Sequence, residues 1–243
     1  MKDEILAAVD REYATDPLSA VTWDDPHPDL EVRYIRDEEY SRVTDPGRFR
    51  IVGARVDAWE RALVGLGLAH AEPVVTPSGW NQAPSQEAAM LVPSAEGARP
   101  LVLAKPELDG VQGSVLVTGI GVAGKRNEIE ELGFAPTCGC DACDSGSDSF
   151  LEEVDNAVWR VVGGFIRIAG DGWFVERSSV GGLMSSDGDV EPPVDIDDID
   201  EQVDRARAGK ITRGHVLIGE PWWAGLERRN GSYRATALPQ RRR

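Results

Sequence analysis

Between residues 88 and 119 the chain alternates short apolar runs with proline and glycine, and this pattern limits the fold more than any other feature. The runs are Ala89–Val92, Leu101–Ala104 and Ser114–Thr118, and each has the length of a single strand. The connections between them are too short for the crossover helices that parallel neighbours would need. We therefore expect these strands to pair as a mostly antiparallel meander.

Two other segments have the periodicity of helices that bury one face. In the first, Asp45 precedes a proline suited to the first helical position, and apolar residues then recur at spacings of three and four as far as Leu66. The second spans about 148–162, where Ser149 and Glu152 match a capping box. Together these segments predict an α+β fold, with a mostly antiparallel, short-stranded sheet packed against two main helices.

We expect residues 1–243 to form a single domain, since 41% of the residues are hydrophobic and can supply a core. Residues 14–29 contain three prolines and are expected to form an irregular N-terminal wrap, followed by a short strand at 30–34. Residues 185–200 are rich in aspartate and should form an acidic loop that leads into a short helix near 197–208.

The net charge of the chain limits the classes of partner that it can bind. Lys and Arg total 26 and Asp and Glu total 42, so the formal net charge is −16, which repels phosphate backbones and argues against nucleic acid. No apolar run approaches the ~20 residues of a membrane helix, and the N-terminus lacks the basic region of a signal peptide. We predict a soluble cytoplasmic protein with no nucleic-acid or membrane partner, for which a protein partner remains open.

All three cysteines of the chain fall within six residues, as Cys138, Cys140 and Cys143. An odd, clustered set is not a disulfide framework, and three thiolates this close can converge on zinc. A closed site needs a fourth ligand, and the sequence offers two nearby aspartates and three distant histidines. These candidates are Asp141, Asp144, His27, His70 and His215.

The same cysteine segment, 138–143, admits other interpretations. Its cysteines could be inert and buttress the fold, or Cys140 and Cys143 could form a redox pair as a C-x-x-C motif. A helix N-terminus near 147 favours a thiolate, whereas the flanking aspartates disfavour it. Asp141, Gly146 and Glu152 also match three positions of a calcium loop, although its other acidic positions are missing.

The glycine-rich loop at 119–125 follows a predicted strand and matches the phosphate-loop pattern G-x-x-x-x-G-K, with Lys125 as its lysine. Arg126 stands where the pattern needs serine or threonine to hold magnesium. The helical stretch expected at about 126–132 is also too short to resemble the helix of a phosphate-binding fold. Nucleotide binding is therefore an alternative and is not our main hypothesis.

Three motifs resemble an uncharacterised actinobacterial protein family of unknown function. They are the run Cys138–Ser147, which reads CGCDACDSGS, the helix entry Thr44–Phe49 and the late Gly219–Trp222. The resemblance covers about residues 40–225, and it implies relatives without implying an activity.

We expect a non-enzymatic protein whose cysteine segment holds zinc or buttresses the fold, with no established catalytic residues. The alternative is an enzyme, either thiol-based at Cys140 and Cys143 or nucleotide-dependent through the loop 119–125. Hydrolase signatures such as G-x-S-x-G and H-E-x-x-H are missing from the sequence.

Overall fold

The computed structural model describes residues 1–28, 35–108, 110–122, 125–186, 190–229 and 231–235. The predicted strand at 30–34 therefore lies outside the described residues. The fold is α+β, as predicted. The α-helices are α1 (Lys2–Tyr13), α2 (Ile51–Gly65), α3 (Gly146–Val162) and α4 (Ile199–Arg207), and the short 3-10 helices are η1 (Pro17–Ala20), η2 (Asp37–Ser41), η3 (Pro46–Arg50) and η4 (Ile196–Asp198).

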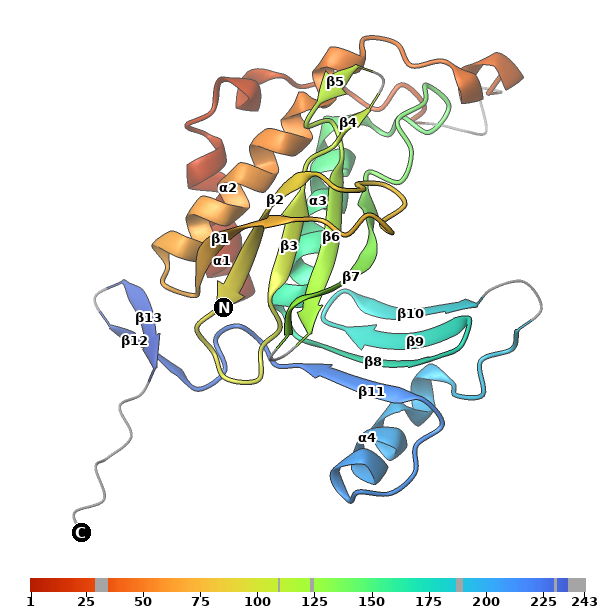
Figure 1. Ribbon diagram of the computed structural model, residues 1–243. Coiled ribbons are helices and arrows are strands. Elements are labelled where there is room, and N and C mark those ends of the chain that lie inside the picture. Colours follow the sequence, from red (N-terminus) through yellow and green to blue (C-terminus); the bar gives the residue numbers. More distant parts are fainter. Residues whose placement is uncertain (29–34, 109, 123–124, 187–189, 230, 236–243) are drawn as a thin grey trace.

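The larger sheet is the predicted meander. Its strands are β1 (Ala69–Val75), β2 (Glu87–Pro93), β3 (Leu101–Ala104), β6 (Leu116–Val122) and β7 (Lys125–Ala135), in the order β1-β2-β3-β6-β7. Each neighbouring pair is antiparallel (Figure 1). The small hairpin β4 (Glu107–Leu108) and β5 (Val111–Gln112) interrupts the connection between β3 and β6.

A second sheet, which the prediction of one sheet did not anticipate, follows α3. Its strands are β8 (Phe165–Gly170), β9 (Trp173–Ser178), β10 (Gly181–Ser186) and β11 (His215–Gly219), in the order β10-β9-β8-β11. Helix α4 packs on β8 and β9 through Ile199 and Val203, which lie against Ile168 and Val175. The expected short helix after the acidic segment is thus confirmed. A last hairpin, β12 (Leu226–Arg229) and β13 (Ser232–Ala235), lies beside the start of α1.

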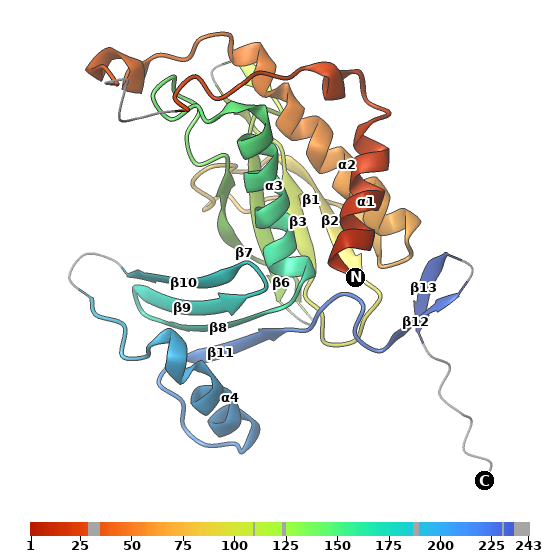
Figure 2. The ribbon, with the colours of Figure 1, turned by 180° about the vertical axis from the view of Figure 1, so that it is seen from behind.

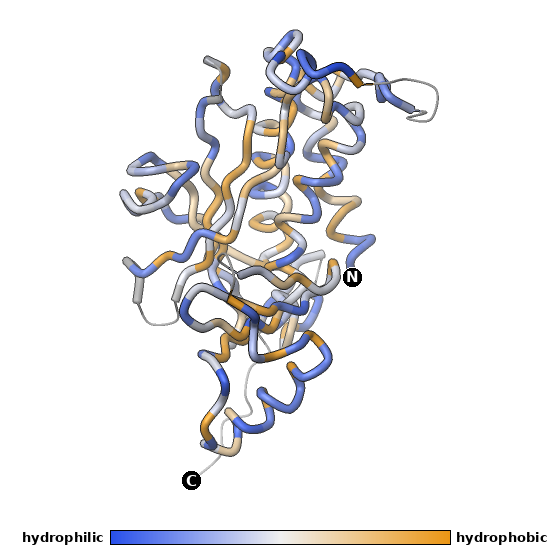
Figure 3. The backbone as a smooth tube through the Cα atoms, turned by 90° about the vertical axis from the view of Figure 1, so that its right-hand side faces the viewer, coloured by the Kyte–Doolittle hydropathy of each residue, from blue (hydrophilic) through white to orange (hydrophobic). Residues whose placement is uncertain are grey.

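Three helices, α1, α2 and α3, cover one face of the larger sheet (Figure 2). The apolar stripe of α2 is buried there, and Trp59 and Leu63 are fully inaccessible to solvent. Val154 and Val158 of α3 are equally buried, so both helices lose water from one face by packing on the strands. The strands in the middle of the molecule carry long stretches of hydrophobic residues (Figure 3). No helix of the described part is long and apolar enough to cross a membrane.

The helix starts differ from the predictions. Asp45 has a left-handed backbone (φ 49°) and makes no side-chain cap, and residues 46–50 form η3 before α2 begins. Helix α3 begins at Gly146, so Ser149 lies inside its first turn and cannot form the predicted capping box. Gly146 has φ 86°, and a Cβ there would lie 2.7 Å from the backbone nitrogen of Asp25. Tertiary contact with the N-terminal wrap therefore sets where α3 starts.

The described part of the glycine-rich segment lies in strands, since residues 119–122 belong to β6 and Lys125 begins β7, so the predicted helical stretch at 126–132 is wrong. Strands β6 and β7 pair on either side of the loop, and residues 123–124 lie outside the described chain. Gly119 lies under the ring of Trp80, where a Cβ would approach ring atoms to 2.4 Å. This close approach explains the glycine, and a phosphate loop would need a helix where β7 stands.

Candidate metal centre

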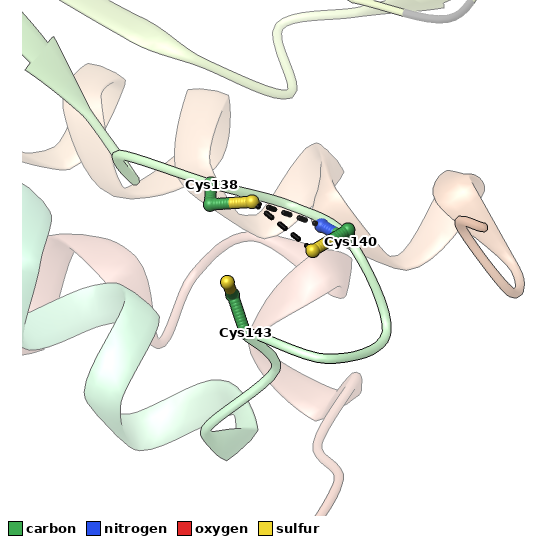
Figure 4. A group of neighbouring side chains, drawn as sticks. All are labelled: Cys138, Cys140 and Cys143. Carbon is green, nitrogen blue, oxygen red and sulfur yellow. Dashed lines mark hydrogen bonds between the residues drawn. The ribbon is translucent and has the colours of Figure 1, made fainter. Parts of the chain in front are cut away.

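The three cysteines lie in the loop that joins β7 to α3, and their sulfurs turn toward a common space (Figure 4). All three Sγ atoms lie within 4.8 Å of one another, and those of Cys138 and Cys140 are 3.2 Å apart. A tetrahedral zinc site with Zn–S bonds of ~2.3 Å places its sulfurs about 3.8 Å apart. The sulfurs thus converge to nearly the spacing of a metal site.

The environment shifts the pKa values of Cys138 and Cys143 in opposite directions. Burial acts to raise the pKa of Cys138, but hydrogen bonds from the backbone of Cys140 and Gly139 and from the other two thiols outweigh it, and this pKa is lowered. Burial raises the pKa of Cys143 to about 12, together with hydrogen bonds to the other two sulfurs and their negative charge. Cys138 therefore loses its proton more readily than Cys143, and a cation bound between the sulfurs would offset the repulsion that opposes a thiolate at Cys143.

The N-terminal part of the chain holds this loop through its backbone. The N–H groups of Asp141 and Ala142 donate to the carbonyl oxygens of Arg42 (2.8 Å) and Glu39 (3.1 Å). At the start of α3, the N–H of Ser147 donates to the carbonyl oxygen of Trp23 (3.0 Å). Residues 39–42 therefore hold the middle of the cysteine loop, and the predicted wrap at 14–29 holds the start of α3 through Trp23.

Asp141, a predicted candidate for the fourth ligand, is engaged elsewhere. Its Oδ2 accepts from Arg42 Nε (2.5 Å) and from the Thr44 hydroxyl (2.7 Å), and its Oδ1 accepts from the Thr44 N–H (2.6 Å). Burial acts against ionisation, yet these hydrogen bonds and the charge of Arg42 lower the pKa of Asp141 to about 2. Its carboxylate therefore anchors the loop.

Asp144, the other local candidate, is buried and equally committed. Its Oδ1 accepts from Trp23 Nε1 (2.8 Å) and the Gly146 N–H (3.0 Å), and its Oδ2 accepts from Arg48 Nη2 (2.5 Å). The Arg48 guanidinium also lies 4.6 Å from the ring centre of Trp23 and 5.0 Å from that of Phe49. Asp144 thus joins the wrap, η3 and the start of α3.

The three histidines lie in different parts of the fold. His27 is 7% exposed and comes close to the loop, where its Nε2 donates to the carbonyl oxygen of Asp141 (2.7 Å). Its Nδ1 is buried with no hydrogen-bond partner in the described part of the chain. His70 and His215 lie on β1 and β11. Within the residues described, no histidine or carboxylate joins the three sulfurs in a group of metal-ligand spacing.

A cavity of about 290 Å³ adjoins the cysteines, and Cys138, Gly139 and Cys140 form part of its wall. Most of its other wall residues are apolar or aromatic, with a few polar side chains. They are Val43, Pro46, Phe49, Pro106, Val115, Phe134 and Pro136, with Gln82, Glu107, Ser114 and Thr137.

The structure does not support the calcium pattern, because Asp141 is bound by Arg42 and Thr44 and Gly146 begins a helix.

Replacing Asp144 with asparagine is expected to lower the free energy of unfolding by about 3 kcal/mol, because it leaves Arg48 without its buried counter-charge. Urea unfolding of the metal-free protein measures this change. Asp148→Asn is the matched control, since Asp148 is exposed in the first turn of α3 and should change stability by less than about 0.5 kcal/mol. Equal effects of the two substitutions would show that Asp144 does not anchor the loop.

The loop and the segments that hold it fall within one family match. The model of a family of unknown function, DUF6226, matches residues 9–225. The chain belongs to this family. Its match spans the wrap, the cysteine loop and both sheets, and the family description assigns no activity. No curated protein and no solved structure matches the chain.

Proposed function

We propose that this member of the family binds one zinc ion through Cys138, Cys140 and Cys143. The convergence of the three sulfurs to within 4.8 Å of one another carries the proposal. Thiolates are soft ligands that favour zinc over magnesium or calcium, and a bound cation relieves the repulsion between them. Arg42, Thr44 and Arg48 hold the loop from outside by binding its two aspartates, so the sulfurs need not fold around the metal from a disordered state.

Elemental analysis tests the proposal. Protein purified from cells grown with zinc should contain about one zinc per chain, and a chromophoric chelator should compete for it. A folded protein that contains no metal and takes up no zinc in the competition would contradict the zinc site. The cysteines would then only buttress the fold.

Thiol chemistry is the second candidate, and the lowered pKa of Cys138 favours it. The raised pKa of Cys143, about 12, argues against Cys143 as the nucleophile and supports Cys138 in its place. Alkylation by iodoacetamide, mapped by mass spectrometry, should therefore modify Cys138 first in metal-free protein. Zinc should suppress this labelling, and labelling that zinc leaves unchanged would favour the thiol function over the metal site.

The cellular location and the partners of the protein are also part of the proposal. The three free cysteines fit a reducing compartment such as the cytoplasm, and the negative charge disfavours nucleic acid and anionic membranes as partners. The proposed zinc site is structural in this setting, so the protein is proposed to be non-enzymatic. A protein partner fits the same properties, and no surface in the described residues singles one out.

A further inference from the structure

The three cysteines leave a zinc ion one ligand short, and this shortage is the starting point. Structural zinc sites close with four protein ligands, whereas sites with three protein ligands keep the fourth position for water or an outside molecule. Asp141 and Asp144 are held by Arg42, Thr44 and Arg48, and His27 does not reach ligand spacing with all three sulfurs. Since none of the described residues supplies a fourth ligand, the open position can take one from outside the chain.

The cavity indicates where this ligand lies. Cys138 and Cys140 belong to both the sulfur group and the cavity wall, so the metal would sit at the edge of the cavity. Phe49, Phe134 and three prolines offer flat apolar surfaces. The volume of about 290 Å³ is close to the lower bound for small-molecule sites, about 300 Å³. A fused ring system fits this volume and these apolar walls.

Charge selects the kind of donor atom. Three thiolates and Zn²⁺ carry a net charge of about −1. Glu107 is the one charged residue among the described cavity residues, and Arg42 and Arg48 are already paired with aspartates. A carboxylate or phosphate would add negative charge without a cation to balance it, whereas a neutral nitrogen would not.

We propose that the cavity binds a neutral aromatic heterocycle whose unprotonated ring nitrogen completes the metal site as its fourth ligand. This inference rests on the proposed zinc site. The nitrogen donates its lone pair to the metal, and the water that held the position leaves. The resulting set of three sulfurs and one ring nitrogen is that of a Cys₃His site, with the imidazole supplied by another molecule.

The test uses the full chain loaded with Co²⁺, whose visible absorption reports the ligands of a tetrahedral site. Benzimidazole is the probe, and it should shift the cobalt bands with saturation. It should bind at least about tenfold more tightly than imidazole, because its second ring buries additional apolar surface. Indole, which has no basic ring nitrogen, and benzoate, which is anionic, should leave the bands unchanged.

Two variants show whether the cavity is responsible. Thr137 is an exposed cavity residue next to Cys138, and Thr137→Trp should weaken benzimidazole binding at least about tenfold while cobalt still binds. Ile211→Trp is the matched control, since Ile211 is 87% exposed and lies outside the cavity, and it should bind benzimidazole like the original protein.

The outcomes separate the two proposals. If the chain takes up no cobalt or zinc, the metal site itself is wrong. If cobalt binds with a stoichiometry of about one but benzimidazole leaves its bands unchanged, only the open position is wrong. In that second case His27→Gln would alter the cobalt bands if His27 moves to close the site.

Discussion

Replacing Cys140 with serine is expected to lower the affinity for zinc by at least about 100-fold, since even changes around metal ligands cost about 10-fold to 100-fold. Cys140 is the buried member of the group, and it contacts Cys138 through its sulfur (3.2 Å) and its backbone N–H (3.5 Å from Cys138 Sγ). Serine keeps the size but offers a hard, weakly acidic oxygen in place of a soft thiolate. Competition with a chromophoric chelator measures the loss.

The metal-free variant supplies the control for folding. Cys140→Ser should unfold in urea within about 1 kcal/mol of the original metal-free protein, because the loop is held by Asp141 and Asp144. Ser149→Ala, a half-buried change in the first turn of α3, should leave zinc affinity unchanged. An unchanged affinity in Cys140→Ser would mean that the three sulfurs do not bind zinc together.

The meander and both large helices could be predicted from the sequence because their signals are local. Short runs such as Leu101–Ala104 between prolines and glycines predict strands, and the spacing of apolar residues along α2 predicts a buried face. The two sheets could not be separated in this way. Strands β8 and β9 are neighbours in the sequence, but the pairing of β8 with β11, more than 40 residues later, depends on tertiary packing.

The cysteine segment was found from its spacing, whereas its supports were not. Trp23, Arg42 and Arg48 lie about a hundred residues before the loop that they hold, and no local pattern links them. The two aspartates illustrate the consequence. From the sequence they are candidate ligands because they flank the cysteines, but arginines from the N-terminal part pair with both of them. Their role depends on partners that only the fold identifies.

The same kind of long-range pairing joins the three helices behind the larger sheet. Arg55 of α2 bonds Asp155 of α3 through two parallel hydrogen bonds, Nε to Oδ1 (2.8 Å) and Nη2 to Oδ2 (2.7 Å), and its Nη1 reaches Asp10 of α1 (2.8 Å). Trp59 Nε1 also donates to Oδ1 of Asp155 (2.7 Å). Burial acts to lower the pKa of Arg55, but the two aspartates outweigh it, so the guanidinium stays charged.

Replacing Asp155 with alanine is therefore expected to lower the free energy of unfolding by about 3 to 5 kcal/mol, because it leaves Nε and Nη2 of the buried Arg55 and the indole N–H of Trp59 without their acceptors. Urea unfolding measures the change, and the double variant Arg55→Ala with Asp155→Ala should cost less than the two single changes added together. The pair Arg61 and Glu12 also joins α2 to α1, but both side chains are at least 40% exposed. Removing Glu12 should cost less than about 1 kcal/mol. Equal losses at Asp155 and Glu12 would contradict the view that burial makes the Arg55 pair a main tie between the helices.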